Sequence, residues 1–417
     1  MITIEEAAKK SGKSQKTIRR AIAAKQLSAE KIQNHYRIDE KDFSVWEDSG
    51  CSTEGSEDPQ NILVEKKDRI NWIDISDDWE KDGWKHKSDS NGFNFIDLFS
   101  GAGGLSCGLV MAGFTPIGSV EIMPQAVETY KYNFVKKHYF DEKPVTSDIR
   151  SKEVKTQLYH SVAGKKVDLI VGGFPCQGFS LAGYRVVADP RNSLYLEMLA
   201  IVKHIKPDFV VMENVEGLRS MLNGKIEEKI IKDYKKIGYK INVTILNSAD
   251  YFTPQIRHRV LFIGNCIGAK NYHPKPMIEE NNYVTLGQAI GKYMDIKEDK
   301  SFNHVFARSS PAMRARLAAV PVGKSLYGNY SDAWKKSPWD KPSCTIKENH
   351  GGVNIHPILN RTLTARELAA LQTFPDDFFF CGSKKWQLVQ IGNAVPCLLG
   401  KAIGIAVKKS LELARKK

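Results

Sequence analysis

Residues 93–113, FNFIDLFSGAGGLSCGLVMAG, join an apolar run, a glycine-rich turn and a second apolar run, and this stretch decides the fold class. The first run predicts a buried strand over 93–99, and the second predicts a helix. The three glycines of the turn let the backbone bend sharply and approach a ligand where a Cβ atom would clash. The dinucleotide-binding pattern needs a glycine where Ser106 stands, so a pyrophosphate cofactor is disfavoured. Taken alone, the turn is equally typical of an ordinary strand–helix connection.

Acidic residues close the next two stretches of the chain. Glu121 ends the apolar run TPIGSVE, about where such folds bind ribose hydroxyls. Asp148 stands in a third acidic stop, Ser-Asp-Ile at 147–149. Further strands and helices are then predicted to alternate, with strands at 165–174, 208–215, 241–251 and 259–265 and helices at 193–205 and 225–239. This alternation predicts an α/β fold with a parallel sheet, whose ligand sites lie at the carboxyl ends of the strands.

Composition excludes several classes of protein. The 417 residues carry a net charge of +13, and 42% are hydrophobic and 26% charged, which is typical of globular proteins. No apolar run approaches the ~18 residues of a membrane span, and the N-terminus lacks an apolar signal core. Seven cysteines without a CxxC pair predict neither a disulfide framework nor a metal site, so a reducing cytoplasm is expected. The basic excess favours a polyanionic partner.

Charge divides the chain into three parts. Residues 1–46 hold ten Lys and Arg against six Asp and Glu, residues 47–90 hold six against thirteen, and residues 91–417 hold 45 against 29. The acidic middle part begins rich in Ser and Gly, which is typical of a linker. Its later residues, ILVEKKDRINWIDISDDW, are apolar enough to pack locally. We therefore expect a small basic module, an acidic linker over 47–90 and a large basic body.

The N-terminal module has the pattern of a helix-turn-helix. Thr3 and Glu6 form a capping box that can open a helix, Gly12 and Lys13 break the chain, and Ser14 can cap a second, basic helix. The following AEKIQNHYRI alternates like a hairpin, and a last helix follows it. Residues 2–46 resemble the excisionase/MerR-type winged helix-turn-helix, which implies DNA binding. A helical dimerisation cap with a solvated basic face is the alternative.

Reactive side chains are predicted to gather at the strand ends of the body. Cys176 lies in GGFPCQGFS just after a strand, where a thiol can be exposed and deprotonated. Glu213 ends the next strand, and Gln255, Arg257 and Arg259 alternate in QIRHR before another strand, so that their side chains would point the same way. A thiol, a carboxylate and paired guanidiniums suit nucleophilic attack on a planar, electron-poor ring. Each residue alone is also explained as a core cysteine, a strand-end glutamate or a surface arginine.

The order of the motifs resembles that of the DNA (cytosine-5) methyltransferases. The chain carries FIDLFSGAGG, VEI, SDI, GGFPCQGFS, MENV, QIRHR, RTLTARELAALQTFPDDF and QIGNAVP in the family's sequence, over roughly residues 93–264 and 343–405. The resemblance implies an S-adenosylmethionine-dependent, Rossmann-like catalytic domain over 91–264 that is completed by 385–417. It also implies a target-recognition small domain over 265–384, so that DNA would lie in a cleft between two lobes.

The resemblance assigns roles to individual residues. It implies that S-adenosylmethionine lies on the glycine turn, with Glu121 at the ribose and Asp148 at the adenine amine; the implied cofactor residues are Asp97, Phe99, Gly101, Gly103, Gly104, Glu121, Asp148, Leu194 and Asn393. Cys176 matches the nucleophile that adds to C6 of cytosine, because unactivated C5 attacks a methyl sulfonium poorly. Glu213 matches the carboxylate at N3 and the exocyclic amine, and Arg257 and Arg259 match positions at O2. The cytosine must be flipped out of the duplex, and residues 177–190 match the loop that closes over it.

The expected partner is double-stranded DNA. Residues 265–342 contain twelve Lys and Arg against seven Asp and Glu, with interspersed aromatic residues that suit phosphate tracking and groove insertion. In bacteria this family commonly protects host DNA from a separate restriction endonuclease, which implies a cytoplasmic, nucleoid-associated enzyme without metal or membrane. Two alternatives are an RNA cytosine-5 methyltransferase and a transcriptional regulator with secondary methylation activity.

Overall fold

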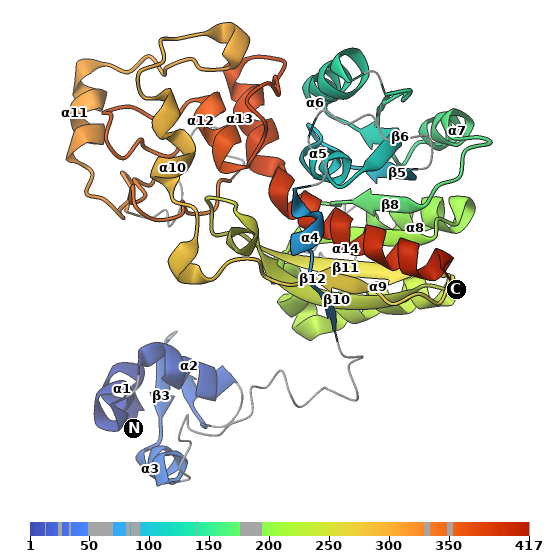
Figure 1. The fold of residues 1–417 in the computed structure, drawn as a ribbon. Coiled ribbons are helices and arrows are strands. Elements are labelled where there is room, and N and C mark those ends of the chain that lie inside the picture. The colour runs from blue at the N-terminus through green and yellow to red at the C-terminus, as the bar shows by residue number, and fades with distance from the viewer. Residues whose placement is uncertain are drawn as a thin grey trace. The chain divides into compact units, whose positions relative to one another are not determined.

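The computed structural model describes residues 1–12, 14–23, 27–32, 35–48, 70–80, 84, 92–138, 140–175, 194–328, 334–347 and 353–416. These residues form two compact units, residues 1–69 and residues 70–417. Figure 1 shows the elements of both units.

The first unit has the predicted helices and hairpin. Its elements are β1 (Ile2–Thr3), α1 (Ile4–Ser11), α2 (Gln15–Ala23), β2 (Glu30–Ile32), β3 (His35–Ile38) and α3 (Glu40–Asp48). Both hydrogen bonds of the expected capping box, between Thr3 and Glu6, are present. Gly12 ends α1 in the left-handed region with φ 67°. The strands pair antiparallel in the order β1-β3-β2 over a core that includes Ile18, Ile38 and Phe43.

A mixed seven-stranded sheet forms the centre of the second unit. Its order is β10-β11-β9-β8-β5-β6-β7, with β5 (Phe93–Leu98), β6 (Phe114–Glu121), β7 (Val145–Thr146), β8 (Leu169–Gly172), β9 (Phe209–Val215), β10 (Lys240–Asn247) and β11 (His258–Asn265). Strands β7, β6, β5, β8 and β9 pair in parallel, whereas β11 lies antiparallel to both of its neighbours. Chain order reverses between β5 and β8, which is where open α/β sheets bind ligands.

Helices cover both faces of this sheet (Figure 1). One face packs on α5 (Gly104–Met111) and α14 (Cys397–Arg415), and the other packs on α7 (Lys152–Ser161), α8 (Leu194–Ile205) and α9 (Lys225–Lys236). Side chains alternate between the two cores as strand geometry requires: Phe95 of β5 faces the first core and Ile96 faces the second. The remaining elements here are α6 (Pro124–Tyr130), the π-helical turn η2 (Lys131–Lys137), and the 3₁₀ helices η6 (Glu216–Gly224) and η7 (Ser248–Tyr251).

The predicted linker ends earlier than residue 90. Strand β4 (Asn71–Ile73) pairs in parallel with β12 (Tyr272–Pro274), and the short helix α4 (Ser76–Trp79) follows it. Ile75, Trp79 and Trp84 are buried in the core of the second unit. Residues 70–80 therefore belong to the large unit, because burial of their apolar side chains stabilises them there although the stretch is acidic. Strand β12 likewise packs beside α14, although residues from 265 onward were expected in the small domain.

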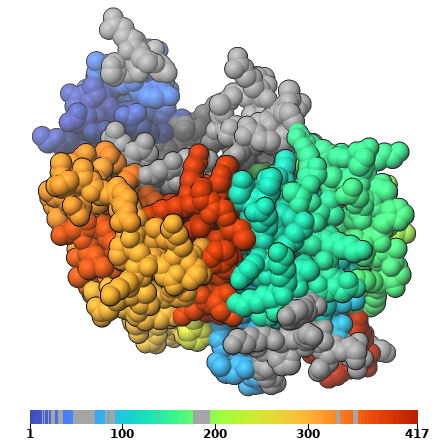
Figure 2. Space-filling model, turned by 90° about the horizontal axis from the view of Figure 1, so that it is seen from above, coloured from blue at the N-terminus to red at the C-terminus, as the bar shows by residue number. Residues whose placement is uncertain are grey.

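A small lobe, residues 278–383, lies beside the sheet within the second unit. It contains η8 (Glu280–Asn282), α10 (Leu286–Ile290), η9 (Gly291–Tyr293), η10 (Lys300–Phe302), α11 (Pro311–Ala319) and α12 (Ala365–Leu371), and α13 (Lys384–Asn393) leads out of it. Figure 2 shows its orange-to-red surface next to the teal surface of the sheet and its helices. Buried Arg366 holds the lobe together by donating to the backbone carbonyls of Phe302, Pro375 and Phe378.

One stretch among the described residues, Lys384–Arg415, which comprises α13 and α14, has the length and composition of a membrane span. Its most apolar window is 78% buried inside the protein. Packing explains that apolar composition, because α14 is the central helix of one core.

The contact between α5 and α14 gives a test of the fold. A Cβ atom on Gly108 would lie 2.2 Å from the carbonyl oxygen of Cys397, so Gly108→Ala should push the two helices apart and lower the free energy of unfolding by about 1–3 kcal/mol. Urea denaturation measures this loss. Gly328→Ala is the matched control, because Gly328 is exposed and nothing lies within 4 Å of the added atom. Equal stability of the two variants would contradict the close approach.

Candidate active site

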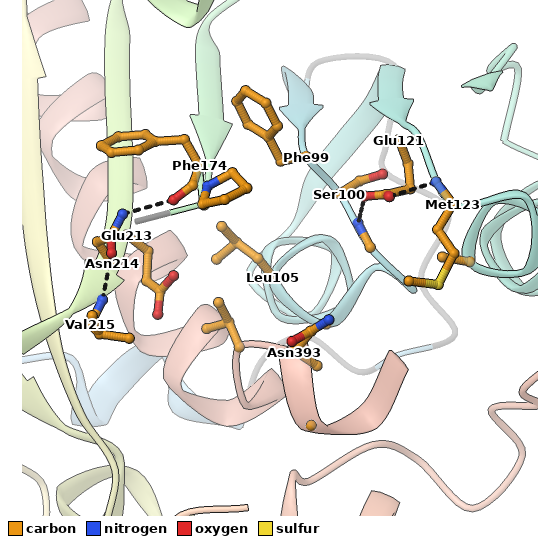
Figure 3. Close-up of a pocket in the computed structure, with 18 of the residues that line it drawn as sticks. Phe99, Ser100, Leu105, Glu121, Met123, Phe174, Glu213, Asn214, Val215 and Asn393 are labelled. Atoms are coloured by element: carbon orange, nitrogen blue, oxygen red, sulfur yellow. Dashed lines mark hydrogen bonds between the residues drawn. The ribbon is translucent and has the colours of Figure 1, made fainter. Parts of the chain in front are cut away.

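A cavity of about 870 Å³ opens at the carboxyl ends of β5, β6, β8 and β9. It is lined by eight of the nine expected cofactor residues and by three of the four expected catalytic residues, namely Asp97, Phe99, Gly101, Gly104, Glu121, Asp148, Leu194, Asn393, Glu213, Arg257 and Arg259. In Figure 3, Glu121 and Glu213 lie at opposite ends of the cavity, with Leu105 between them. Cys176 falls outside the described residues; its neighbour Pro175 lines the cavity.

The glycine turn is shaped by two close approaches. Gly103 has φ 92°, and a Cβ atom there would lie 2.5 Å from the ring of Phe134. A Cβ atom on Gly104 would lie 2.4 Å from the carbonyl oxygen of Val395, a residue of the C-terminal segment. Gly103 is therefore required for packing behind the turn and does not line the cavity, whereas Gly104 does. The turn thus brings the start of α5 against the chain that returns from the small lobe.

Glu121 accepts hydrogen bonds from the backbone of the turn. Its Oε2 accepts from the N–H of Gly101 and its Oε1 from the N–H of Met123, both at 2.8 Å, as drawn in Figure 3. Burial raises the pKa of Glu121, and these backbone bonds oppose that rise. Each carboxylate oxygen has a further lone pair, so the group can also accept from a pair of hydroxyls.

Asp97 lies deeper, at 1% exposure, and accepts a hydrogen bond of 2.6 Å from the hydroxyl of Ser106. The hydroxyl of Tyr130 in turn donates to Ser106 over 3.1 Å. Burial raises the pKa of Asp97 to about 8, assisted by the negative charges of Glu142 and Glu121. A cation bound in this end of the cavity would favour the ionised form of Asp97.

Asp148 is already engaged by a neighbour. Its Oδ1 accepts from the backbone N–H of Arg150 at 2.9 Å, and the guanidinium of Arg150 pairs with both carboxylate oxygens. This side-chain hydrogen bond holds the pKa of Asp148 below its ordinary value. An amine of a ligand would therefore share an ionised carboxylate with Arg150, which also lines the cavity.

At the other end of the cavity, Glu213 forms an ion pair with Arg259. Arg259 Nε lies 2.7 Å from Glu213 Oε1, and Glu213 is 8% exposed. The antiparallel register places Arg259 opposite Val215, so Glu213 and Arg259 reach the same end of the two strands. A Cβ atom on Gly173 would lie 3.1 Å from Glu213 Oε2, and Asn214 donates to the carbonyl of Phe174 at 2.8 Å. The segment that leads to Cys176 is thus fixed beside the carboxylate.

The residues of QIRHR do not share one role. Arg257 is 3% exposed and donates to the carbonyls of Ile346 and Ala394, at 2.8 and 3.0 Å. Gln255 is fully buried and lies outside the cavity lining. Gln255, Arg257 and Arg259 were expected to point the same way and to act together. Of the three, only Arg259 pairs with Glu213.

Sequence reasoning missed several lining residues. Thr345, Ile346 and Lys347 arrive from the small lobe, and Ile122 exposes 62% of its surface at the cavity. Ile122 directly follows Glu121, and its apolar side chain at that strand end is the one signal that could have identified it. Among the described residues, no group of His, Cys, Asp and Glu could hold a metal ion.

Comparisons with known proteins agree with this geometry. Residues 93–409 match the family model of the C-5 cytosine-specific DNA methylases, and residues 1–50 match that of a helix-turn-helix domain. The chain is 41% identical over 330 residues to the Type II methyltransferase M1.HphI of Haemophilus parahaemolyticus, which covers 76% of this chain and 86% of that protein. It is 33% identical over 369 residues to M.DdeI of Desulfomicrobium norvegicum, covering 74% and 87%.

A solved structure from E. coli, described as a DNA modification methyltransferase encoded within a prophage, is similar with a TM-score of 0.63 and 27% identity. That match covers 77% of this chain and 100% of the other. The resemblance seen in the motifs is confirmed: the chain belongs to the C-5 cytosine-specific DNA methylase family and carries an N-terminal helix-turn-helix domain.

Proposed function

We propose that this chain methylates C5 of a cytosine flipped out of duplex DNA, with S-adenosylmethionine as methyl donor and Cys176 as nucleophile. The observation that carries the proposal is the single cavity that has Glu121 at one end and the Glu213–Arg259 pair at the other. A cofactor held at the first end and a base held at the second would meet within one cavity.

The residues of the first end fit S-adenosylmethionine. Gly104 leaves no room for a Cβ atom, Glu121 keeps lone pairs for the ribose hydroxyls, and Asp97 is a buried acid near the methionine end. Phe99, Gly101, Asp148, Leu194 and Asn393 would complete the contacts, and Gly103 would support the turn from behind. The cofactor would supply an electrophilic methyl group on a sulfonium.

The residues of the second end fit activation of cytosine. The thiolate of Cys176 would add to C6 of the ring while Glu213, in its protonated form, gives its proton to N3, so that C5 would become nucleophilic toward the methyl group that the cofactor supplies. Transfer of the C5 proton to a base and return of the N3 proton to Glu213 would then break the C6–S bond, release Cys176 as a thiolate and restore the aromatic ring. Arg259 would hold Glu213 in place through their ion pair.

The small lobe would read the target sequence. Residues 265–342, most of which belong to it, hold twelve Lys and Arg against seven Asp and Glu, and the lobe reaches one wall of the cavity through Thr345, Ile346 and Lys347. The relatives are named Type II methyltransferases, which supports protection of host DNA in a bacterial cytoplasm from a separately acting restriction endonuclease. Their similarity supports DNA, not RNA, as the substrate.

The nucleophile can be tested directly. Cys176→Ser should lower methyl transfer by about a thousandfold or more and leave S-adenosylmethionine binding almost unchanged, because the hydroxyl is a far poorer nucleophile than a thiolate. Methyl incorporation and equilibrium dialysis measure the two. Cys266→Ser is the control, since Cys266 is exposed on the surface. DNA with 5-fluorocytosine at the target should trap the wild-type chain at Cys176; trapping at another cysteine would contradict the assignment.

The recognition role is tested by exchange. Replacing residues 275–342 with the matching span of a relative should change the methylated sequence and not the chemistry, because direct readout needs side chains in the groove. The exchange begins after Pro274 because β12 packs with the large unit. Bisulfite sequencing identifies the methylated cytosine. A folded, active chimera that keeps the original target would show that the sequence is read elsewhere.

The helix-turn-helix unit should add a second DNA affinity. Removing residues 1–69 should leave turnover on short duplexes largely unchanged. It should reduce binding to a distinct site in the chain's own promoter, together with the salt dependence of that binding. Footprinting of the full and shortened chains on promoter and target DNA measures this.

Arg19→Ala on the exposed side of α2 should reproduce the loss, and Lys9→Ala on α1 serves as its control. If the shortened chain no longer protects the methylation target but the promoter footprint is unchanged, the unit adds avidity at the target, and autoregulation is refuted. Unchanged binding to both DNAs would indicate dimerisation.

A further inference from the structure

Side chains from elsewhere in the chain donate to the carbonyl groups of Ile391 and Gly392 in the last turn of helix α13 and of Ala394, which follows it. The final four carbonyls of a helix have no partner within it, and those of a buried end need one. Gln372 Nε2 donates to the carbonyls of Ile391, at 2.8 Å, and Ala394, at 3.3 Å. Arg257 donates to the carbonyls of Gly392, at 3.3 Å, and Ala394, at 3.0 Å. The positive charge of Arg257 also favours this helix end electrostatically.

Gln255 joins Gln372 to the segment that leads into the strand carrying Arg259. Its Nε2 donates to Gln372 Oε1 at 3.0 Å and to the carbonyl of Leu371 at 3.2 Å. Its Oε1 accepts from the backbone N–H of Ile346 at 2.9 Å. Gln255 and Gln372 are both fully buried, and neither lines the cavity. Together they form a polar link from the catalytic strand to the end of α13.

The end of α13 is also a wall of the cavity. Gly392, Asn393 and Ala394 line it, and Asn393 is exposed there. The carbonyl of Val395 approaches Gly104 so closely that a Cβ atom at that glycine would lie 2.4 Å away. A small shift of residues 391–395 would therefore move Asn393 relative to the glycine turn.

We propose that Gln372 is a positioning residue: it touches neither cofactor nor base, but it fixes the last turn of α13 and thereby the place of Asn393 in the cofactor end of the cavity. The inference rests on the proposed function in that S-adenosylmethionine binds at this end. It differs from a purely structural role because it concerns the affinity of the folded protein for the cofactor as well as its stability.

The test compares two buried amides that each make three hydrogen bonds. Gln372→Leu removes the bonds to Ile391, Ala394 and Gln255. Asn271→Leu removes an equal set, with Lys240, Asn242 and Asn265, outside the cavity lining. Isothermal titration of the full chain with S-adenosylmethionine gives the Kd, and calorimetric unfolding gives the Tm. Both variants should lower the Tm. Only Gln372→Leu should raise the Kd for S-adenosylmethionine, roughly tenfold, with a smaller change in kcat at saturating cofactor.

Several results would overturn the proposal. Wild-type affinity in Gln372→Leu despite a lowered Tm would make Gln372 purely structural, and equal weakening in Asn271→Leu would indicate general loosening. If Gln372→Leu does not fold, Gln372→Met, which is similar in length and flexible, gives the same comparison. Failure of the wild-type chain to bind S-adenosylmethionine would refute the proposed function itself, so the two failures are distinguishable.

Discussion

The large unit depends on one close approach, that of α5 to the segment that begins α14. Gly104 and Gly108 on α5 meet the carbonyls of Val395 and Cys397, and Gly400 in turn lies against Leu105. Only residues without a side chain allow two backbones to approach so closely. This contact brings the last part of the chain onto the glycine turn after the long excursion through the small lobe. The walls of the cavity therefore come both from the first strand and helix of the large sheet and from residues 390–395, near the end of the chain.

Asp97 and Glu121 at the cofactor end differ from Glu213 at the other end, and from their neighbour Asp148, in having no cationic partner among the described residues. Glu213 is paired with Arg259. Asp97 and Glu121 have hydroxyl and backbone donors, and burial raises the pKa of both. In the described parts of the chain, neither has an ion-pair partner within 4 Å. A positively charged ligand at the cofactor end would meet two carboxyl groups, Asp97 and Glu121, that have no cationic partner. A base at the other end would meet Glu213, which Arg259 already holds in an ion pair.

Local patterns in the sequence were enough to predict the first unit and the α/β class of the second, although β11 pairs antiparallel where a parallel sheet was expected. The family resemblance supplied eleven of the residues that line the cavity. The capping box at Thr3 and the turn at Gly101 are short-range signals, and Glu121 follows from its place at a strand end. The end of the linker was wrong, because the burial of Trp79 and Trp84 depends on residues distant in the chain. Gln255 and Gln372 meet across 117 positions, and no local pattern carries such a contact. Cys176 remains a prediction from its motif.

The position of α14 in the order of the chain has a consequence for synthesis on the ribosome. Domains generally fold as units while the chain emerges, and the helix-turn-helix unit is made before the large unit. One face of the large sheet is covered by α14, whose residues 397–415 emerge after every strand of that sheet. A nascent chain can therefore present a folded DNA-binding unit while its catalytic core still exposes apolar surface. The early unit would then be available to tether the growing polypeptide near DNA before any methylation can begin.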